Sequence, residues 1–209
     1  MTSSGLLIAG VGLPGVGKST LLAALAERNS WQRFVEPEEA LWPQAARDHS
    51  LAGVFTALTW FRAMRVANLY AAARARQAGQ IAMIDSYYDK LMTYYIKEPQ
   101  MDWLVSPDDP YYDLLFQMAL TDHFYLPTAD VIILFTATFE DWERCIKARQ
   151  RQLDVERVFP RAFPFQDHLR RAVRQESAWN GSRVVVFENQ FGSIERAVED
   201  LAAQVAAAL

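Results

Sequence analysis

The stretch GVGLPGVGKST, residues 10–20, follows the apolar run LLIA at residues 6–9. From Gly12 to Ser19 it satisfies the pattern G-x-x-x-x-G-K-[ST] at every fixed position. The glycines let the backbone turn tightly and point successive N–H groups into a concavity, and a helix that begins near Lys18 adds its positive dipole end. Because the motif lies between a predicted strand and a predicted helix, we interpret it as a phosphate-binding loop and not as a chance glycine-rich turn.

The residue types of this loop predict how it would hold a nucleotide. The ammonium group of Lys18 would reach the β- and γ-phosphates, and the hydroxyl of Ser19 would bind Mg²⁺. The predicted nucleotide contacts are Gly12, Gly15, Val16, Gly17, Lys18, Ser19 and Thr20.

Short β-rich runs alternate with helical patterns along the whole chain. Continuous hydrophobic strands belong in a sheet that is covered on both faces, and strand–helix alternation implies right-handed parallel crossovers. A chain of 209 residues suits one large core. We therefore predict a single, doubly wound α/β domain over residues 1–209. The strands are predicted at 5–11, 33–36, 80–85, 129–136 and 182–188, the helices at 18–28, 48–78, 110–126, 139–151, 165–178 and 193–208, and Pro-punctuated loops at 97–110 and 155–165.

Composition narrows the possible partners and the compartment. The net charge of −4 provides no general attraction to nucleic acid or to an anionic membrane. No apolar run approaches the ~20 residues that span a bilayer. The single Cys145 cannot form an internal disulfide, and the first residues, MTSSG, lack the cationic start of a secretory signal. We expect a cytoplasmic protein that binds neither nucleic acid nor membrane.

Two carboxylates follow strands at the same predicted edge of the sheet. Asp85 closes the run QIAMID, where a magnesium-bound water needs an acceptor, so Ser19 and Asp85 form the predicted metal site. Glu36 ends the second run, and Pro37 stops that strand from continuing. Glu36 would either take the proton of an attacking hydroxyl or bind Mg²⁺ through water. The alternatives are a turn aspartate at position 85 and a solvated acid at position 36.

Arginines supply candidate cations for a substrate or for moving phosphate. Arg62 interrupts the apolar stripe of the helix predicted at 48–78, and an arginine on such a face needs a partner, either a substrate or a structural carboxylate. Arg149 and Arg151 belong to an arginine-rich run beside a Pro-bounded loop, a pattern typical of a lid that closes over phosphates, here residues 149–164. An exposed helix face balanced by acids is the alternative for this run.

A phosphate loop binds a nucleotide, but it does not determine which molecule receives the phosphoryl group. A GTPase would carry a guanine-reading N-K-x-D motif, which is lacking after the later strands, and a switch ATPase would have a transmission module, which the sequence does not indicate. A small-molecule kinase needs a base, an acceptor pocket and mobile cations, and this chain has candidates for all three.

The succession of phosphate loop, Glu36-Pro37, Asp85 and the stretch PTADVIILFTATFEDWERCIKARQR at 127–151 resembles the deoxynucleoside kinases and their relatives, the thymidylate kinases. The resemblance implies a parallel five-stranded sheet of order 2-3-1-4-5, ATP with Mg²⁺ as donor, and transfer to the 5′-hydroxyl of a nucleoside-like acceptor. It also implies that Glu36 is the general base, that Asp85 matches the family's acid, that Arg149 and Arg151 are lid arginines, and that Arg62 orients the base.

The sequence departs from this family at two places. Ser86 and Tyr87 follow Asp85 where the family commonly has an arginine. Phe55 lies seven residues before Arg62, where a base-reading glutamine is common, and a phenyl ring cannot replace its hydrogen bonds. The predicted substrate-binding set is Glu36, Phe55, Arg62 and Tyr87.

Two other functions stay open at this point. A nucleoside monophosphate kinase, of thymidylate-kinase type, has an acceptor that is already a phosphate and needs no strong base. A nucleotide-binding regulator would hydrolyse ATP slowly and report to a partner protein, and the missing arginine after Asp85 favours it. Apolar helix faces also allow a homodimer, which composition does not require.

Overall fold

The sheet has the predicted composition and order. A computed structural model describes residues 5–149 and 162–209. Its five strands are all parallel, in the order β2-β3-β1-β4-β5, which confirms the order 2-3-1-4-5. The strands are β1 (Leu6–Gly12), β2 (Gln32–Phe34), β3 (Ile81–Ile84), β4 (Val131–Thr136) and β5 (Arg183–Glu188).

Each long helix begins and ends within two residues of its predicted bounds, except that the predicted end of α6 lies outside the described residues. The long helices are α1 (Lys18–Asn29), α3 (His49–Gln77), α5 (Tyr112–Tyr125), α6 (Phe139–Arg149), α7 (Phe165–Asn180) and α8 (Ile194–Ala208). Short pieces that the sequence pattern missed are η1 (Glu39–Leu41), α2 (Gln44–Arg47), α4 (Tyr88–Leu91) and η2 (Met92–Tyr94).

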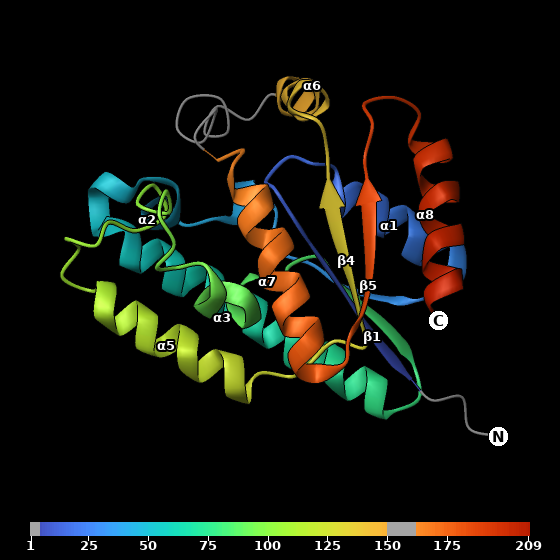
Figure 1. Ribbon diagram of the computed structural model, residues 1–209, viewed down its shortest axis with the longest axis horizontal. Helices are drawn as coiled ribbons and strands as arrows, with labels where there is room; N and C mark the ends of the chain where they lie inside the picture. The colour runs from blue at the N-terminus through green and yellow to red at the C-terminus, as the bar shows by residue number, and fades with distance from the viewer. Residues whose placement is uncertain (1–4, 150–161) are drawn as a thin grey trace.

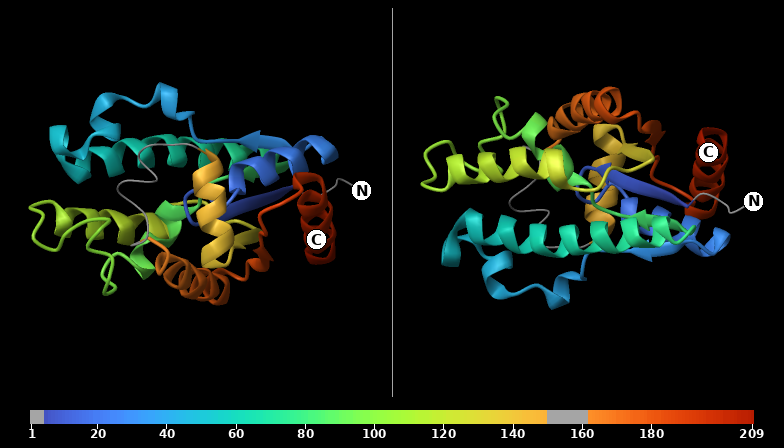
Figure 2. Two further views of the ribbon diagram at one scale, coloured as in Figure 1. Left: turned by 90° about the horizontal axis from the view of Figure 1, so that it is seen from above. Right: turned by 90° about the horizontal axis from the view of Figure 1, so that it is seen from below.

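The helices form a layer on each face of the sheet. Figure 1 shows α1 and α8 on one face and α3, α5 and α7 on the other. Helix α8 contacts α1 and β5, helix α3 contacts β1, β2 and β3, and helix α7 contacts β1, β4 and β5. In both views of Figure 2 the long helices α3 and α5 extend away from α8. This is the doubly wound arrangement that continuous apolar strands demand, since such strands must be covered on both faces.

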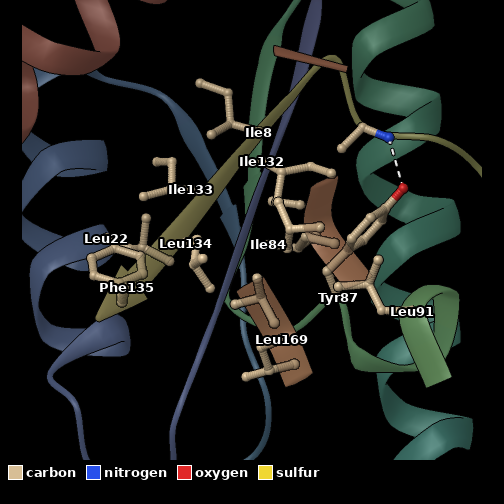
Figure 3. Packing of buried hydrophobic residues seen from close by; sticks show 14 of the residues in the cluster. Ile8, Leu22, Ile84, Tyr87, Leu91, Ile132, Ile133, Leu134, Phe135 and Leu169 are labelled. Atoms are coloured by element: carbon tan, nitrogen blue, oxygen red, sulfur yellow. Dashed lines mark hydrogen bonds between the residues drawn. The ribbon is translucent and has the colours of Figure 1, made fainter. Parts of the chain in front are cut away.

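The core lies around the two central strands. Ile8 in β1 and Ile132 and Ile133 in β4 are fully buried, and Leu22 from α1 and Leu169 from α7 cover them from opposite faces (Figure 3). Full burial of such side chains contributes about 1.5–3 kcal/mol each relative to exposure. The core therefore fixes β1, and with it the loop that follows.

Caps define where two helices begin. The hydroxyl of Thr138 accepts a hydrogen bond from the N–H of Asp141 at 3.1 Å and so caps α6. Ser193 accepts one from the N–H of Arg196 at 3.4 Å and so caps α8. Helix α3 is interrupted at Gly53, whose backbone is not helical (φ 75°, ψ 164°).

Parallel strands carry their carboxyl ends to one edge, and the candidate residues collect there. Gly12 ends β1, Asp85 directly follows β3, and Glu36 lies two residues after β2. An edge of this kind is where α/β sheets bind ligands. None of the helices in residues 5–149 and 162–209 is long and apolar enough to cross a membrane.

Candidate active site

A cavity of about 1020 Å³ opens at the carboxyl edge of the sheet. At one end it is lined by the phosphate loop and the start of α1, by α6, and by the segment from β5 into α8. At the other end it is lined by α3, by α4 and η2, and by the beginning of α7. The two carboxylates Glu36 and Asp85 both line it. A cavity of this size can hold a nucleotide and a second small molecule together.

Two glycines give the phosphate loop its shape. Gly15 and Gly17 have φ angles of 76° and 90°, in the left-handed region that disfavours other residues. A Cβ at Gly17 would also lie 2.7 Å from the Nδ2 atom of Asn189. Gly17 caps α1 without a side chain, so the first N–H groups of that helix have no intrahelical partner. Such N–H groups at a helix start form an anion-binding site.

Three side chains from distant elements hold the carbonyl oxygens of this loop. The hydroxyl of Tyr88 donates to the Gly12 oxygen, the Trp142 indole donates to the Pro14 oxygen at 2.8 Å, and the Asn189 amide donates to the Val16 oxygen at 2.9 Å. With its carbonyls occupied from outside, the loop is fixed before any phosphate binds. Sequence reasoning missed all three residues.

Lys18 and Ser19 lie on the cavity at the start of α1. The Nζ atom of Lys18 donates to the Leu13 oxygen at 3.1 Å and lies 5.6 Å from the centre of the Tyr88 ring. The Ser19 hydroxyl donates to the Oδ2 atom of Asp85 at 3.0 Å. The structure thus brings together both residues of the predicted metal site.

The residues present fit Mg²⁺ bound with nucleotide and water. In the described part of the chain no group of three or more His, Cys, Asp or Glu side chains could hold a metal ion by itself. Mg²⁺ usually keeps several waters and takes one or two protein ligands plus substrate phosphates. The Ser19 hydroxyl and the Asp85 carboxylate, directly beside the phosphate loop, are such a pair.

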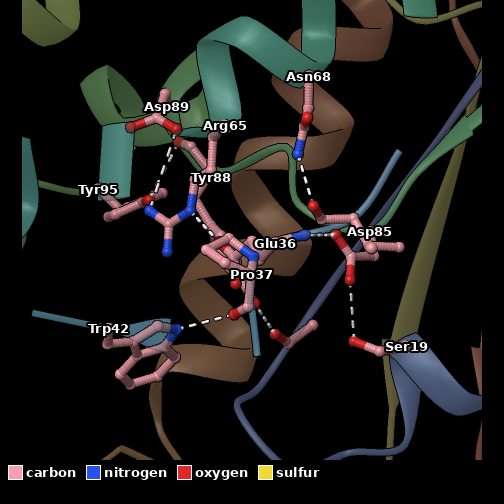
Figure 4. Close-up of polar contacts among 12 residues, drawn as sticks. Ser19, Glu36, Pro37, Trp42, Arg65, Asn68, Asp85, Tyr88, Asp89 and Tyr95 are labelled. Carbon is pink, nitrogen blue, oxygen red and sulfur yellow. Dashed lines mark hydrogen bonds and ion pairs between the residues drawn. The ribbon is translucent and has the colours of Figure 1, made fainter. Parts of the chain in front are cut away.

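Asp85 connects the loop to the second carboxylate. Its Oδ1 atom accepts a hydrogen bond from the Glu36 backbone N–H at 3.1 Å while its Oδ2 atom faces Ser19, as Figure 4 shows. Burial and then the charge of Glu36 raise the pKa of Asp85 above its ordinary value. A cation that enters the site would therefore favour the ionised form of this carboxylate.

Glu36 forms an ion pair with Arg65 of α3, at the cavity wall. The Arg65 guanidinium donates to the Glu36 carboxylate and lies 4.0 Å from Asp89 (Figure 4). Burial acts to raise the pKa of Glu36, but the charge and hydrogen bond of Arg65, with the charge of Lys18, hold it below the ordinary value. The Arg65 side chain is 14% exposed and lies over the rings of Phe61 and Tyr88. Glu36 is therefore ionised and oriented at neutral pH.

Of the two neighbouring arginines Arg62 and Arg65 of α3, Arg65 lines the cavity and Arg62 does not. Arg62 makes two hydrogen bonds of 2.6 Å to Asp122 of α5, which is the structural carboxylate of the two alternatives, and it does not line the cavity. Arg65 therefore places a positive charge at the cavity wall, one turn beyond Arg62 on α3. Leu58 lies seven residues before Arg65, as Phe55 does before Arg62. It lines the cavity and, like Phe55, is apolar.

Two other predicted substrate contacts lie away from the cavity. Phe55 stacks on Tyr111 with ring centroids 4.4 Å apart. Tyr87 is 1% exposed, and its hydroxyl accepts a hydrogen bond from the Ala129 N–H in the core. Its neighbour Tyr88 lines the cavity instead.

The predicted lid falls largely outside the described residues. Arg149, the last residue of α6, lines the cavity near the phosphate loop, with one of its nitrogens 4.0 Å from where a Cβ on Gly15 would lie. Arg151 lies outside the described residues, as do residues 150–161 of the lid segment 149–164. Of the predicted nucleotide contacts, Gly15, Gly17, Lys18, Ser19 and Thr20 line the cavity, whereas Gly12 and Val16 present their carbonyls to Tyr88 and Asn189.

The sequence matches no protein-family model and no curated protein, but solved structures resemble the whole chain. A deoxyadenosine kinase from M. mycoides with bound dATP has a TM-score of 0.66 at 17% identity, over 96% of this chain and 99% of that one. A thymidylate kinase from Candida albicans has a TM-score of 0.62 at 16% identity, over 98% and 92% of the two chains. A thymidylate kinase from Ehrlichia chaffeensis has a TM-score of 0.52 at 15% identity, over 97% and 99%. At these identities the likeness concerns architecture: the chain has the P-loop fold of the deoxynucleoside and thymidylate kinases.

Proposed function

We propose that this chain is a kinase that transfers the γ-phosphoryl group of ATP, with Mg²⁺, to the hydroxyl of a nucleoside or nucleoside-like compound. One observation carries the proposal: the ionised carboxylate of Glu36 lines the same cavity as the phosphate loop, and the backbone N–H of Glu36 donates to Asp85, which in turn accepts a hydrogen bond from Ser19. The deoxyadenosine kinase of similar fold binds dATP, and another structure of it holds the products dCMP and dCDP. These likenesses support a nucleotide and a nucleoside-like molecule as the two ligands.

The donor nucleotide would be held by backbone and by cations of the loop. N–H groups of the loop and the first turn of α1 would bind the β- and γ-phosphates, and Lys18 would leave the Leu13 carbonyl to neutralise them. Ser19 and Asp85 would hold Mg²⁺, which neutralises charge on the phosphate oxygens when bound. Arg149, and Arg151 within the predicted lid, would pair with the oxygens of the group in transfer.

Glu36 would act on the acceptor. Its carboxylate takes the proton of the attacking hydroxyl as that oxygen bonds to the γ-phosphorus, and the bond from the γ-phosphorus to the bridging oxygen breaks to release ADP. Arg65 holds the carboxylate in place and ionised. The pairing lowers the basicity of Glu36, so its contribution comes from position and charge at neutral pH.

The test is Glu36→Gln, assayed with labelled ATP against a panel of deoxynucleosides and nucleoside monophosphates. We expect kcat to fall by roughly 100-fold or more, the usual contribution of a positioned base, with ATP affinity unchanged. Glu140→Gln is the matched control, because the side chain of Glu140 on α6 is 73% exposed and forms an ion pair with Arg144, whose side chain is 53% exposed.

Two results would contradict the proposal. Near-normal turnover of Glu36→Gln would show that Glu36 is not the general base. If the labelled products also derive from monophosphates, the protein is a nucleoside monophosphate kinase. Phosphate release that is independent of acceptor, with no labelled product, indicates a regulatory ATPase.

A further inference from the structure

The acceptor end of the cavity is walled by apolar and aromatic side chains, which we call the aromatic chamber. They come from the segment before α2, from one face of α3, from α4 and η2, from the loop that precedes α5, and from the start of α7. The residues are Trp42, Val54, Ala57, Leu58, Phe61, Tyr88, Met92, Tyr95, Trp103, Leu104 and Phe165.

The polar atoms of three of these rings are bonded to the chain itself. The Trp42 indole N–H donates to the Pro37 oxygen at 2.8 Å, and the Tyr95 hydroxyl donates to the Tyr88 oxygen at 3.2 Å. The Tyr88 hydroxyl donates to the Gly12 oxygen of the phosphate loop. Figure 4 shows the Trp42 N–H directed at the Pro37 backbone. These rings therefore offer their surfaces to a ligand and keep their hydrogen-bonding atoms for the fold.

Two arginines beside the chamber, Arg65 and Arg47, are also bonded to the chain itself. Arg65 pairs with Glu36 and Asp89, and the Arg47 guanidinium donates to the Trp42 and Ala40 carbonyls at 2.8 and 3.0 Å. Glu36 is the group that faces the reacting hydroxyl, so Arg65 is committed to holding it.

Amide and imidazole side chains, which read the edge of a nucleobase, do not line the aromatic chamber in the described part of the chain. The amides that do line the cavity, Asn189 and Gln190, follow β5 at the opposite, phosphate-loop end, and Asn189 is bonded to Val16. The position on α3 that faces the chamber one turn before Phe61 is Leu58. A ligand edge with donors and acceptors would lose its water here without gaining partners of this kind.

The rings brace one another through their edges. Trp42 meets Phe61 at 4.8 Å and 90°, and Phe165 meets Tyr95 at 4.9 Å and 73° and Trp103 at 5.7 Å and 71°. Edge-to-face packing of this type fixes ring orientation and leaves faces available to stack. A chamber of fixed aromatic surfaces suits a flat ring.

The geometry points to an acceptor that carries its hydroxyl on a flat, apolar ring system, recognised in the aromatic chamber by stacking and shape and not by hydrogen bonds to a ring edge. This inference rests on the proposed phosphoryl transfer and specifies its substrate class. A nucleoside with a strongly hydrogen-bonding base is then a poor acceptor, because its polar edge is buried unpaired.

The test compares two deoxyribosides that share the 5′-hydroxyl and the shape of the ring. One is thymidine, and the other carries 2,4-difluorotoluene, which has the outline of thymine without its hydrogen-bonding edge. With labelled ATP we expect kcat/KM to be about tenfold higher for the difluorotoluene compound, since an unpaired buried group typically costs that much. A kcat/KM ratio at or below one would overturn the inference and leave the kinase proposal intact.

A substitution provides the reciprocal test. Leu58→Gln adds an amide to the half-buried face of α3 in the chamber. The ratio of kcat/KM for thymidine to that for the difluorotoluene compound should rise about tenfold, and this ratio is independent of the fraction of protein that folds. Leu114→Gln, at a position on α5 that is 54% exposed, is the matched control and should leave the ratio unchanged. An equal ratio in Leu58→Gln and wild type would count against the inference.

Binding separates failure of this inference from failure of the kinase proposal. If neither compound is phosphorylated, thermal shifts with a non-hydrolysable ATP analogue still compare the two ligands. A larger rise in Tm with the difluorotoluene compound supports the chamber's selectivity, whereas a larger rise with thymidine refutes it.

Discussion

Replacing Arg65 by Met tests the ion-pair cluster on which the candidate site depends. Methionine keeps the apolar contacts with Phe61 and Tyr88 and removes the charge. Two carboxylates then lose their cation: Glu36, whose side chain is 26% exposed, and Asp89, whose side chain is 6% exposed.

The expected loss of stability follows from burial. Breaking a buried ion pair by removing one partner costs about 3–5 kcal/mol, because the remaining charge is uncompensated. Glu36 retains some contact with water, so we expect about 3 kcal/mol near pH 7. The control Arg144→Met removes an ion pair of 2.6 Å to Glu140 whose side chains are 53% and 73% exposed, and such a pair contributes about 0.5 kcal/mol or less.

The loss should depend on pH with a defined sign. In the wild type the pKa of Glu36 lies below its ordinary value of 4.5, so its stabilising contribution is present at neutral pH and disappears as pH falls through the folded-state pKa. Burial already raises the pKa of Asp89 above its ordinary value in the wild type; without Arg65, burial would raise the pKa of Glu36 above that of the unfolded chain as well, and the pKa of Asp89 further. The destabilisation should therefore be largest at about pH 8 and smaller at about pH 5.

The assay is urea denaturation of wild type, Arg65→Met and Arg144→Met at both pH values, together with the pH profile of kcat/KM. The acid limb of that profile should move to higher pH in Arg65→Met. If the two variants lose the same free energy of unfolding within about 1 kcal/mol, or if the Arg65→Met deficit grows as pH falls, the cluster does not have the energetics argued from its burial.

Further outcomes follow from the other contacts. Arg62→Met should lower stability by about 2–4 kcal/mol, because it leaves buried Asp122 unpaired, while KM for ATP stays the same; a changed KM in a fully folded variant would contradict a structural role. Gly17→Ala should cost about 1–2 kcal/mol of stability from its positive φ and abolish tight ATP binding, measured by denaturation and nucleotide titration. Asn189→Ala should weaken ATP binding by about five- to tenfold through loss of one hydrogen bond to the loop, and an unchanged Kd would show that the loop holds its shape without it.

The fold was predictable because its signals are local. Continuous apolar runs mark buried parallel strands, and the long helices have clear periodicity. Helices of four residues, such as α2 and α4, are too short for a 3.6-residue period to be visible, and they were missed. The sheet order came from the family resemblance, since strand order is a matter of long-range pairing that no local pattern encodes.

The site was predictable only where it is contiguous in sequence. The loop residues form one motif, whereas Asn189 reaches Val16 across 173 positions and Trp142 reaches Pro14 across 128. Arg62 and Arg65 are three residues apart and so lie on nearly the same stripe of α3, which periodicity cannot separate.

The backbone after β3 is irregular, so no helix or strand period predicts which of its side chains points into the core. Tyr87 points into the core and Tyr88 toward the phosphate loop, although the two are adjacent. Of the three residues that bond to the loop carbonyls, only Asn189 could have been suspected from the sequence, because it is a polar residue directly after a strand.

The hydrogen bond from Asn189 to Val16 joins the residue directly after β5 to the phosphate loop that follows β1. During synthesis on the ribosome, the phosphate loop lacks this hydrogen bond until Asn189 has emerged. Ligand capture should accordingly appear late and abruptly as the nascent chain lengthens past the last strand. In the folded protein, bound ATP would in turn stabilise the contact between the loop after β1 and the segment after β5 and slow their separation.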